Sequence, residues 1–213
     1  MKILVFSDVH GNLPAFKKML ESAGQFDEFI CLGDVVGYGP WGNECVDLVS
    51  SLGKGIYLEG NHERDYLQGV YSGTNEIAKI FFDHSYPSLN NFTKIKDLKK
   101  SYFFDGYIFT HTILNRNIYQ DSKIILDNNY VIGHSHHQFK MEQGNYILYN
   151  AGSVGQNRGY INVVNYMLYD SLEKKFEMKS VIYDVSEVIN EMETKKYPAY
   201  CVDYYKNKKR WKN

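Results

Sequence analysis

Side chains able to bind metal ions recur in five short segments of this chain. Aspartate, asparagine and histidine supply the candidate ligands, and each segment directly follows a short apolar run. The segments are residues 7–12, 33–40, 60–63, 110–112 and 133–136. If each apolar run is a strand of one sheet system, these segments meet at one rim, because ligands bind outside the carboxyl ends of parallel strands. We therefore expect a single composite site.

Two of these segments carry candidate ligands two residues apart. Residues i and i+2 of a strand point to the same side, so Asp8 and His10 converge if the strand continues that far, and so do His134 and His136. A carboxylate–imidazole pair and a double-imidazole pair suit ions such as Mn²⁺, Fe²⁺ or Zn²⁺. Asp34 adds a carboxylate that could bridge two ions.

Two further residues complete the set of candidate donors: Asn61 offers an amide oxygen and His111 another imidazole. A site with two divalent ions can generate hydroxide and clamp a phosphorus atom for in-line displacement. Adjacent strand residues point opposite ways, so His62 is expected to diverge from Asn61 and to face a substrate. An imidazole that titrates near neutrality could donate a proton to the leaving alkoxide.

Apolar periodicity indicates the elements that must position these side chains. Short β-branched and aromatic runs predict three strands, and helical spacing bounded by Asn and Gly predicts two helices between them. The strands are expected at 3–6, 29–32 and 56–58, and the helices at 13–23 and 43–52. This βαβαβ order predicts parallel strands with right-handed crossovers.

The rest of the chain is dominated by shorter strands separated by turns. Residues 64–100 are interpreted as a variable cap or loop region with a helix at 76–84. Further strands are expected at 102–104, 107–109, 130–132, 146–149, 161–164 and 176–183, and a closing helix at 185–192. We expect one domain over residues 1–213, built of two packed sheets with helices outside, that ends in a basic, solvated tail at 204–213.

The composition is that of an ordinary globular protein, with 44% apolar and 23% charged residues in 213. A net charge of −1 makes nucleic acid an unlikely partner, because the chain has no excess of cations to neutralise phosphates. Three widely spaced cysteines, the absence of a signal-peptide pattern and the lack of a long apolar window predict a soluble, cytoplasmic protein without a membrane segment. The sequence leaves a homo-oligomer open.

The motifs together resemble the calcineurin-like metallophosphoesterase superfamily, and in particular its small bacterial and archaeal phosphodiesterase-like branch. The resemblance runs over about residues 1–170 and is carried by Asp8-x-His10, Gly33-Asp34-x-x-Gly37, Gly60-Asn61-His62-Glu63, His111, Gly133-His134-x-His136 and the stretch from Gly152 to Arg158. It implies an α/β fold, a four-layer αββα sandwich of two mixed sheets flanked by helices.

The resemblance also implies roles for single residues. One ion would be held by Asp8, His10, Asp34 and His136, and the other by Asp34, Asn61, His111 and His134. His62 would be the proton donor, and Asn12 and Arg158 would lie near the phosphate of a small phosphate-ester substrate. The two divalent ions are expected to be Mn²⁺, with Fe, Zn or Ni as alternatives. The chain departs from the usual pattern at Glu63, where Asp is common, and at Thr112, where Gly is common.

Three functions are compatible with these residues: a metal-dependent phosphodiesterase or phosphomonoesterase, a catalytically weak or inactive protein-interaction scaffold of the same fold, and a nuclease. Scaffold members of the superfamily typically lack the proton-donating histidine, so His62 favours the enzyme. Near-neutral charge and the absence of a separate DNA-binding domain disfavour the nuclease. The choice between monoesters and diesters depends on residues 64–100 and stays open.

Overall fold

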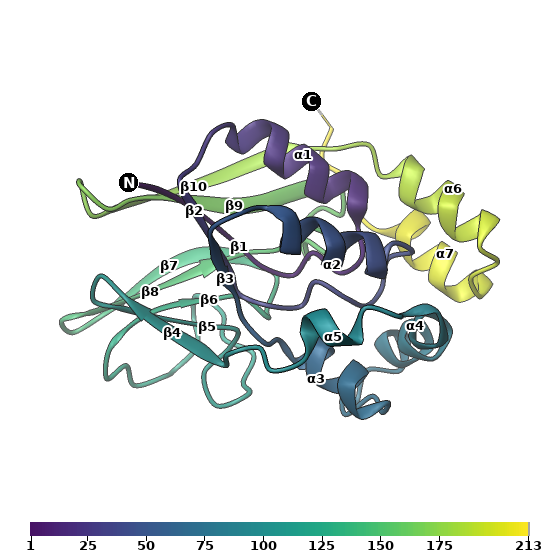
Figure 1. Cartoon of the computed structure of the whole chain (residues 1–213), viewed down its shortest axis with the longest axis horizontal. Helices are drawn as coiled ribbons and strands as arrows, with labels where there is room; N and C mark the ends of the chain where they lie inside the picture. The colour runs from purple at the N-terminus through teal and green to yellow at the C-terminus, as the bar shows by residue number, and fades with distance from the viewer. Residues whose placement is uncertain (213) are drawn as a thin grey trace.

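The computed structural model describes residues 1–212 and contains two five-stranded sheets that pack face to face (Figure 1). The first sheet has the strand order β10-β9-β1-β2-β3. Its three parallel strands are β1 (Lys2–Phe6), β2 (Glu28–Cys31) and β3 (Gly55–Tyr57), as predicted. Antiparallel strands β9 (Val163–Asp170) and β10 (Lys175–Ile182) complete the sheet on the other side of β1.

The second sheet has the order β4-β5-β6-β8-β7. It is formed by β4 (Ser101–Phe104), β5 (Tyr107–Thr110), β6 (Asn129–Ile132), β8 (Tyr146–Ala151) and β7 (Gln138–Gln143). Within it β5, β6 and β8 are parallel, so both sheets present parallel carboxyl ends. Strand β7 was not predicted, because four of its six residues are polar or charged. The strand expected at 161–164 runs instead from Val163 to Asp170.

The core of the first sheet explains why its strands are almost entirely apolar. Leu4 and Phe6 of β1 face helices α1 (Leu13–Ala23) and α2 (Gly42–Ser51), whereas Ile3 and Val5 face the second sheet. A strand covered on both faces cannot alternate apolar with polar residues, and it therefore reads as a continuous apolar run. Helix α6 (Ser186–Thr194) adds to the helical layer.

The outer face of the second sheet carries its own apolar cluster. Ile132, Phe139 and Leu148 pack against Ile118, Ile124 and Leu126 of the irregular segment 111–128. Two mixed sheets with flanking helices confirm the predicted αββα fold, and over this part of the second sheet an irregular segment forms the outer cover.

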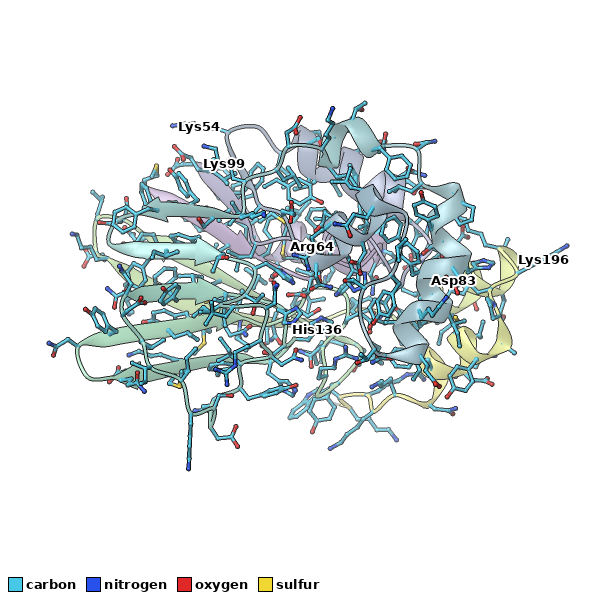
Figure 2. All side chains as sticks on the ribbon, turned by 90° about the horizontal axis from the view of Figure 1, so that it is seen from below. Lys54, Arg64, Asp83, Lys99, His136 and Lys196 are labelled. Atoms are coloured by element: carbon cyan, nitrogen blue, oxygen red, sulfur yellow. The ribbon has the colours of Figure 1, made fainter. Side chains whose placement is uncertain are left out.

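The region expected to be a variable cap is mostly helical. It contains α3 (Asn61–Gln68), α4 (Glu76–Ser85), the 3₁₀ turn η1 (Tyr86–Ser88) and α5 (Phe92–Ile95). Figure 2 shows Arg64, on α3, and His136 near the middle of the molecule, where these helices meet the second sheet. None of the helices in residues 1–212 is long and apolar enough to cross a membrane.

The segment predicted as a basic, solvated tail at 204–213 is exposed at six of its nine described positions, but it begins inside a helix. Residues 204–207 belong to an unpredicted helix, α7 (Ala199–Asn207), in which Tyr205 is fully buried. Beyond the helix, the backbone of Lys209 accepts a hydrogen bond from Ile161 N–H and the backbone of Trp211 bonds to the Asn162 side chain. The last residue, Asn213, lies outside the described part of the chain.

Candidate metal centre

The candidate ligands lie at one end of the sandwich, outside the carboxyl ends of parallel strands from both sheets. They follow β1, β2 and β3 in the first sheet and β5 and β6 in the second, and the loop from Gly152 to Arg158 follows β8. All the predicted metal ligands meet there: Asp8, His10, Asp34, Asn61, His111, His134 and His136. The parallel topology thus brings together residues that are up to 128 positions apart.

The paired ligands converge for a different reason from the one predicted. Asp8, His10, His134 and His136 do not continue their strands but have left-handed backbones, with φ of 57°, 51°, 68° and 59°. Left-handed non-glycine residues are uncommon and cost conformational energy, which the surrounding contacts must offset. Asp8 N–H donates to Gly33 O and His10 N–H donates to Asp34 O, each at 3.0 Å. These two bonds hold the turn at Asp8 and His10 against the segment 33–40.

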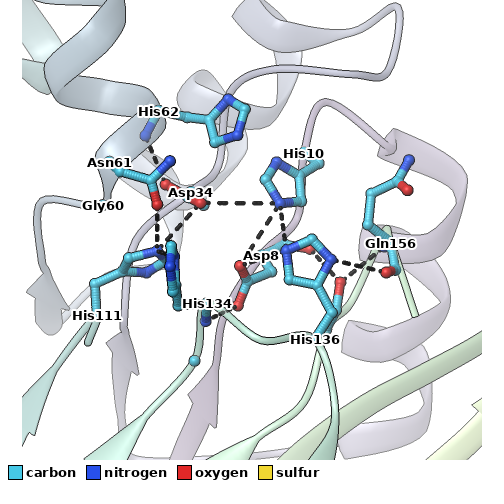
Figure 3. A network of polar contacts seen from close by, with 12 residues as sticks. Asp8, His10, Asp34, Gly60, Asn61, His62, His111, His134, His136 and Gln156 are labelled. Atoms are coloured by element: carbon cyan, nitrogen blue, oxygen red, sulfur yellow. Dashed lines mark hydrogen bonds and ion pairs between the residues drawn. The ribbon is translucent and has the colours of Figure 1, made fainter. Parts of the chain in front are cut away.

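Three imidazole rings of the centre are oriented by the backbone (Figure 3). The Nδ1–H groups of His10, His111 and His136 donate to the carbonyl oxygens of Val36, Leu32 and Gln156 at 3.1, 3.1 and 2.9 Å. A backbone carbonyl can only accept, so each Nδ1 carries a proton, and in the neutral tautomer Nε2 presents a lone pair. A carbonyl oxygen that accepts from the far ring nitrogen is the arrangement that orients histidine side chains toward a metal ion in proteins.

The lone pairs converge on buried carboxylates and on one another. His10 Nε2 and His136 Nε2 are 3.1 Å apart, and so are His111 Nε2 and His134 Nδ1. Asp34 Oδ2 lies 3.2 Å from His111 Nε2 and 3.9 Å from His10 Nε2, between the two groups of imidazoles. Asn61 Oδ1 is 3.0 Å from His111 Nε2. Acceptor atoms that face one another at this distance require a proton or a cation between them.

The donor set fits divalent metal ions. Donor atoms within 4.8 Å of one another form three groups, of which one is Asp8, His10 and His136, another is Asp34, His111 and His134, and the third is His10, Asp34 and His62. Asp8 Oδ1 is fully buried and lies 3.1 Å from His136 Nε2, yet no hydrogen bond to it is formed within residues 1–212, because the proton of the neutral His136 ring is on Nδ1. A buried carboxylate oxygen left without a partner is costly, and a cation would satisfy it.

Comparison with known proteins agrees with this geometry. The family model of the calcineurin-like phosphoesterases matches residues 1–183. The chain belongs to this family. An uncharacterised protein of Methanocaldococcus jannaschii is 28% identical over 230 aligned positions, which cover 93% of this chain and 94% of that protein.

Two solved structures share the whole fold of this chain. A metallophosphoesterase of Sphaerobacter thermophilus superposes with a TM-score of 0.80 at 23% identity, covering 97% of this chain and 98% of that one. A hypothetical protein of Pyrococcus horikoshii superposes with a TM-score of 0.75 at 13% identity, covering 96% and 97%. At these identities the two structures establish a common fold and leave the reaction to be argued from the site.

Burial and charge shift the pKa values of the imidazoles of this centre in opposite directions when no metal is bound. Burial lowers the pKa of His62 to about 3 and those of His134 and His136 to about 4. Burial acts on His111 in the same direction, but the adjacent Asp34 carboxylate outweighs it and raises the pKa of His111 to about 9. His62 therefore does not titrate near neutrality in the metal-free protein, contrary to expectation.

The strand assumed for Asn61 and His62 is absent, because both residues lie in the first turn of α3. The backbone N–H of His62 donates to Asp34 Oδ1 at 2.8 Å, and its ring lies with its centroid 4.8 Å from that of His10. A Cβ on Gly37, whose φ is +89°, would lie 2.5 Å from His62 Nδ1, so only glycine leaves room for this ring. His62 therefore borders the metal centre, although strand alternation does not place it there.

Glu63 connects the loops that carry Asp34 and Asn61. Its carboxylate accepts hydrogen bonds from the backbone N–H groups of Asp34 and Val35, both at 2.7 Å, and of Gly60 at 2.9 Å. It also accepts a bond from the Tyr57 hydroxyl at 2.8 Å. Glutamate, which stands where aspartate is common in the family, thus supplies a longer side chain that holds the segment 33–40 against the start of α3.

Asn12, which was predicted to lie near the phosphate, makes contacts only within the protein, and Thr112 shapes a nearby turn. Asn12 is fully buried, its Oδ1 accepts from Ala15 N–H to cap α1, and its Nδ2 donates to Gly155 O and to the Tyr183 hydroxyl. All its polar groups are used within the protein, so its contacts are those of a structural residue. Thr112, which replaces the usual glycine, donates through Oγ1 to Arg116 O at 2.6 Å and orders a turn at the mouth of the centre.

Arg158 retains the surroundings of an anion-binding residue. Its Nη1 donates to the Tyr204 hydroxyl at 2.7 Å, and no carboxylate of residues 1–212 lies within 4.0 Å of its guanidinium. Tyr38, which lies close to Arg158, has its ring centroid 4.9 Å from that of His10. The sequence alone did not single out Tyr38 or Tyr204, because tyrosines are abundant in this chain and only tertiary packing distinguishes these two.

Proposed function

We propose that the protein is a dinuclear metal-dependent phosphoesterase that hydrolyses small phosphodiesters. The observation that carries this proposal is the set of inward-facing imidazole nitrogens around Asp8 and Asp34, in which the buried Asp8 Oδ1 faces His136 Nε2 at 3.1 Å and has no assigned hydrogen bond within residues 1–212. When bound, two divalent ions supply positive charge to the phosphate oxygens and acidify an attacking water. The preference for diesters over monoesters is supported by the motif resemblance.

The ligand assignment follows the two sides of Asp34. One ion would be held by Asp8, His10, Asp34 and His136, and the other by Asp34, Asn61, His111 and His134. Asp34 is the shared ligand, since its Oδ2 lies between His10 and His111. We favour Mn²⁺, although this donor set also suits Fe²⁺, Zn²⁺ or Ni²⁺.

His62 and Arg158 act on the substrate in this proposal. Arg158 binds a phosphate oxygen, because its guanidinium lies close to Tyr38, which contacts His10, and no carboxylate of residues 1–212 pairs with it. His62 holds the proton for the leaving oxygen. Burial keeps the pKa of His62 near 3 in the metal-free protein, so the bound phosphate anion must raise that pKa for His62 to act as the acid.

Hydrolysis of bis(4-nitrophenyl) phosphate and 4-nitrophenyl phosphate in parallel, with added Mn²⁺, tests the proposal. We expect turnover of the diester to exceed that of the monoester. Asp34→Asn should remove most activity because it weakens both ions, and His62→Ala should lower kcat about 10²- to 10⁴-fold, the usual contribution of a general acid. Equal rates in the wild type and both variants would refute the assignment.

A further inference from the structure

A large cavity beside the metal centre is not used by the chemistry described above. It has a volume of about 810 Å³ and shares His136 with the centre. Its apolar lining comes from Val163 of β9 and from Val181 and Ile182 of β10, and its aromatic lining from Tyr160 and Trp211. Cavities of this size, with apolar lining and a few polar groups, are typical of sites for small organic ligands.

The C-terminal segment forms part of this cavity, and one buried side chain holds it in place. The amide of Asn162 accepts from Trp211 N–H at 2.8 Å and donates to Trp211 O at 3.0 Å, and Asn162 itself is 8% exposed. The Trp211 ring meets Tyr160 edge to face with centroids 5.0 Å apart, yet Trp211 is 49% exposed. A fixed indole with so much exposed surface is a platform on which a flat ring can stack.

Polar groups in the cavity leave one acceptor and one donor open. Gln138 Nε2 donates to the carbonyl oxygens of Ala151 and Tyr166, whereas no donor in residues 1–212 bonds to its Oε1. Ser180 Oγ accepts from Asn165 Nδ2 at 2.7 Å, so its hydroxyl proton is available. An acceptor and a donor beside an aromatic platform complement the edge of a heteroaromatic ring better than a plain hydrocarbon.

The loop between β8 and β9 links this cavity to the proposed phosphate site. Asn157 and Gly159 line the cavity, while the residue between them, Arg158, directs its guanidinium to Tyr204, whose ring lies 6.3 Å from that of Tyr38 at the metal centre. A phosphate held beside Arg158 would therefore have its organic group next to the cavity. We propose that the cavity binds a flat heteroaromatic group of the phosphate ester, an inference that rests on the proposed phosphoesterase function.

Tryptophan fluorescence tests this proposal without hydrolysis. The chain has two tryptophans, so Trp41→Phe leaves Trp211 as the only reporter. With Mn²⁺ added, we expect adenosine 5′-monophosphate to change the Trp211 emission saturably and to bind about tenfold or more tightly than ribose 5-phosphate, the range that base–aromatic stacking confers. The two probes share the ribose and the phosphate, and only adenosine 5′-monophosphate carries the flat adenine ring. Equal affinity for both, or an unchanged emission at saturation, overturns the proposal whether or not the protein hydrolyses esters.

Two variants connect the binding to the cavity. Val181→Trp, measured by calorimetric titration because its new indole would add a second emitter, should fill the cavity and abolish the preference for adenosine 5′-monophosphate over ribose 5-phosphate, with Lys196→Ala on the surface as the control. If Val181→Trp does not fold, Trp211→Ala serves instead, with the Michaelis constants of thymidine 5′-(4-nitrophenyl phosphate) and methyl 4-nitrophenyl phosphate as the readout. We expect the Michaelis constant of the thymidine ester, divided by that of the methyl ester, to be about tenfold higher in Trp211→Ala than in the wild type. A preference or ratio that stays constant places the ring elsewhere and overturns the proposal.

If neither nitrophenyl ester is hydrolysed but the preference for adenosine 5′-monophosphate is present and is lost in Val181→Trp, the phosphoesterase proposal fails while the cavity is confirmed as a ring-binding site. If both esters are hydrolysed but adenosine 5′-monophosphate binds no more tightly than ribose 5-phosphate, the phosphoesterase proposal holds and the cavity proposal fails. The two proposals can therefore be judged separately.

Discussion

Single residues at the metal centre are held in a state that suits metal ions better than protons. His10 and His136 each donate Nδ1–H to a backbone carbonyl, which leaves Nε2 as the inward acceptor of the neutral ring. His111 donates in the same way, but the Asp34 carboxylate raises its pKa to about 9, so a metal ion must displace its second proton. Burial of His62, His134 and His136 lowers their pKa values to between about 3 and 4, so these rings resist protonation. At neutral pH a divalent cation therefore need not compete with a proton for these nitrogens. Histidines of the unfolded chain are also mostly neutral at this pH, because their pKa is about 6.5.

This arrangement predicts that the metal-free protein is destabilised by acid. A histidine whose pKa is lower in the folded state than its unfolded value of 6.5 contributes stability above pH 6.5 and loses it as pH falls toward the folded pKa. From pH 6.5 to 5.5 each fully shifted ring should cost about 1 kcal/mol, or about 3 kcal/mol for His62, His134 and His136 together. Urea denaturation in the presence of a chelator measures this change.

The same experiment has an internal check, because His111 is shifted the other way. Its folded pKa of about 9 means that its contribution is complete below pH 6.5 and is lost as pH rises from 6.5 through 9. His136→Asn should reduce the loss below pH 6.5 by about one third and leave the alkaline loss in place. A free energy of unfolding that is flat from pH 5.5 to 6.5 would contradict these assignments.

At the scale of elements, the start of α3 is fitted closely against the loop after β2. A Cβ added at Gly60 would lie 2.1 Å from Asp34 Oδ1 and 2.7 Å from Glu63 Oε2. The φ of Gly60 is −92°, so its backbone is not strained for other residues and only this close contact demands glycine. The contact sets where both Asn61 and His62 lie.

Gly60→Ala should therefore displace the Asp34 carboxylate and weaken metal binding at least about tenfold, which is the loss typical when the partners of metal ligands are disturbed. Calorimetric titration with Mn²⁺ measures the affinity. Gly42→Ala, at the first position of α2, is the matched control, because its Cβ would meet only Leu89 Cδ1 at 3.6 Å. Equal affinities in the two variants would show that the fit at Gly60 does not position the ligands.

At the scale of the whole molecule, the candidate ligands connect the two sheets. Asp8 and Asp34 follow strands of the first sheet, whereas His111, His134 and His136 follow strands of the second. An ion held by both sets opposes separation of the sheets, and it stabilises the folded state by mass action because the unfolded chain does not form the site.

Mn²⁺ at a hundredfold excess over its dissociation constant should stabilise the protein by about 2.7 kcal/mol. For a chain of this size that corresponds to a rise in Tm of about 5–10 °C, measured by calorimetry with Mn²⁺ and with chelator. Asp34→Asn should lose most of the rise because Asp34 serves both ions, while Asp83→Asn, on the exposed face of α4, should keep it. A full rise in Asp34→Asn would locate the ions elsewhere.

Local sequence was enough to predict much of this protein. Continuous apolar runs followed by Asp, Asn or His predicted β1 to β3, their parallel order and the residues that meet at their carboxyl ends, because a strand buried on both faces has little freedom in composition. The order of the motifs predicted the family and the αββα fold.

Tertiary structure decided the features that depend on contacts between distant segments. The left-handed turns at Asp8 and His134, the position of His62 in a helix and the C-terminal segment that completes the cavity cannot be read locally, because each depends on hydrogen bonds to segments far away in the sequence. The sequence by itself thus determined which residues are available for chemistry. Packing between the sheets, the helices and the C-terminal segment decided how these residues face one another.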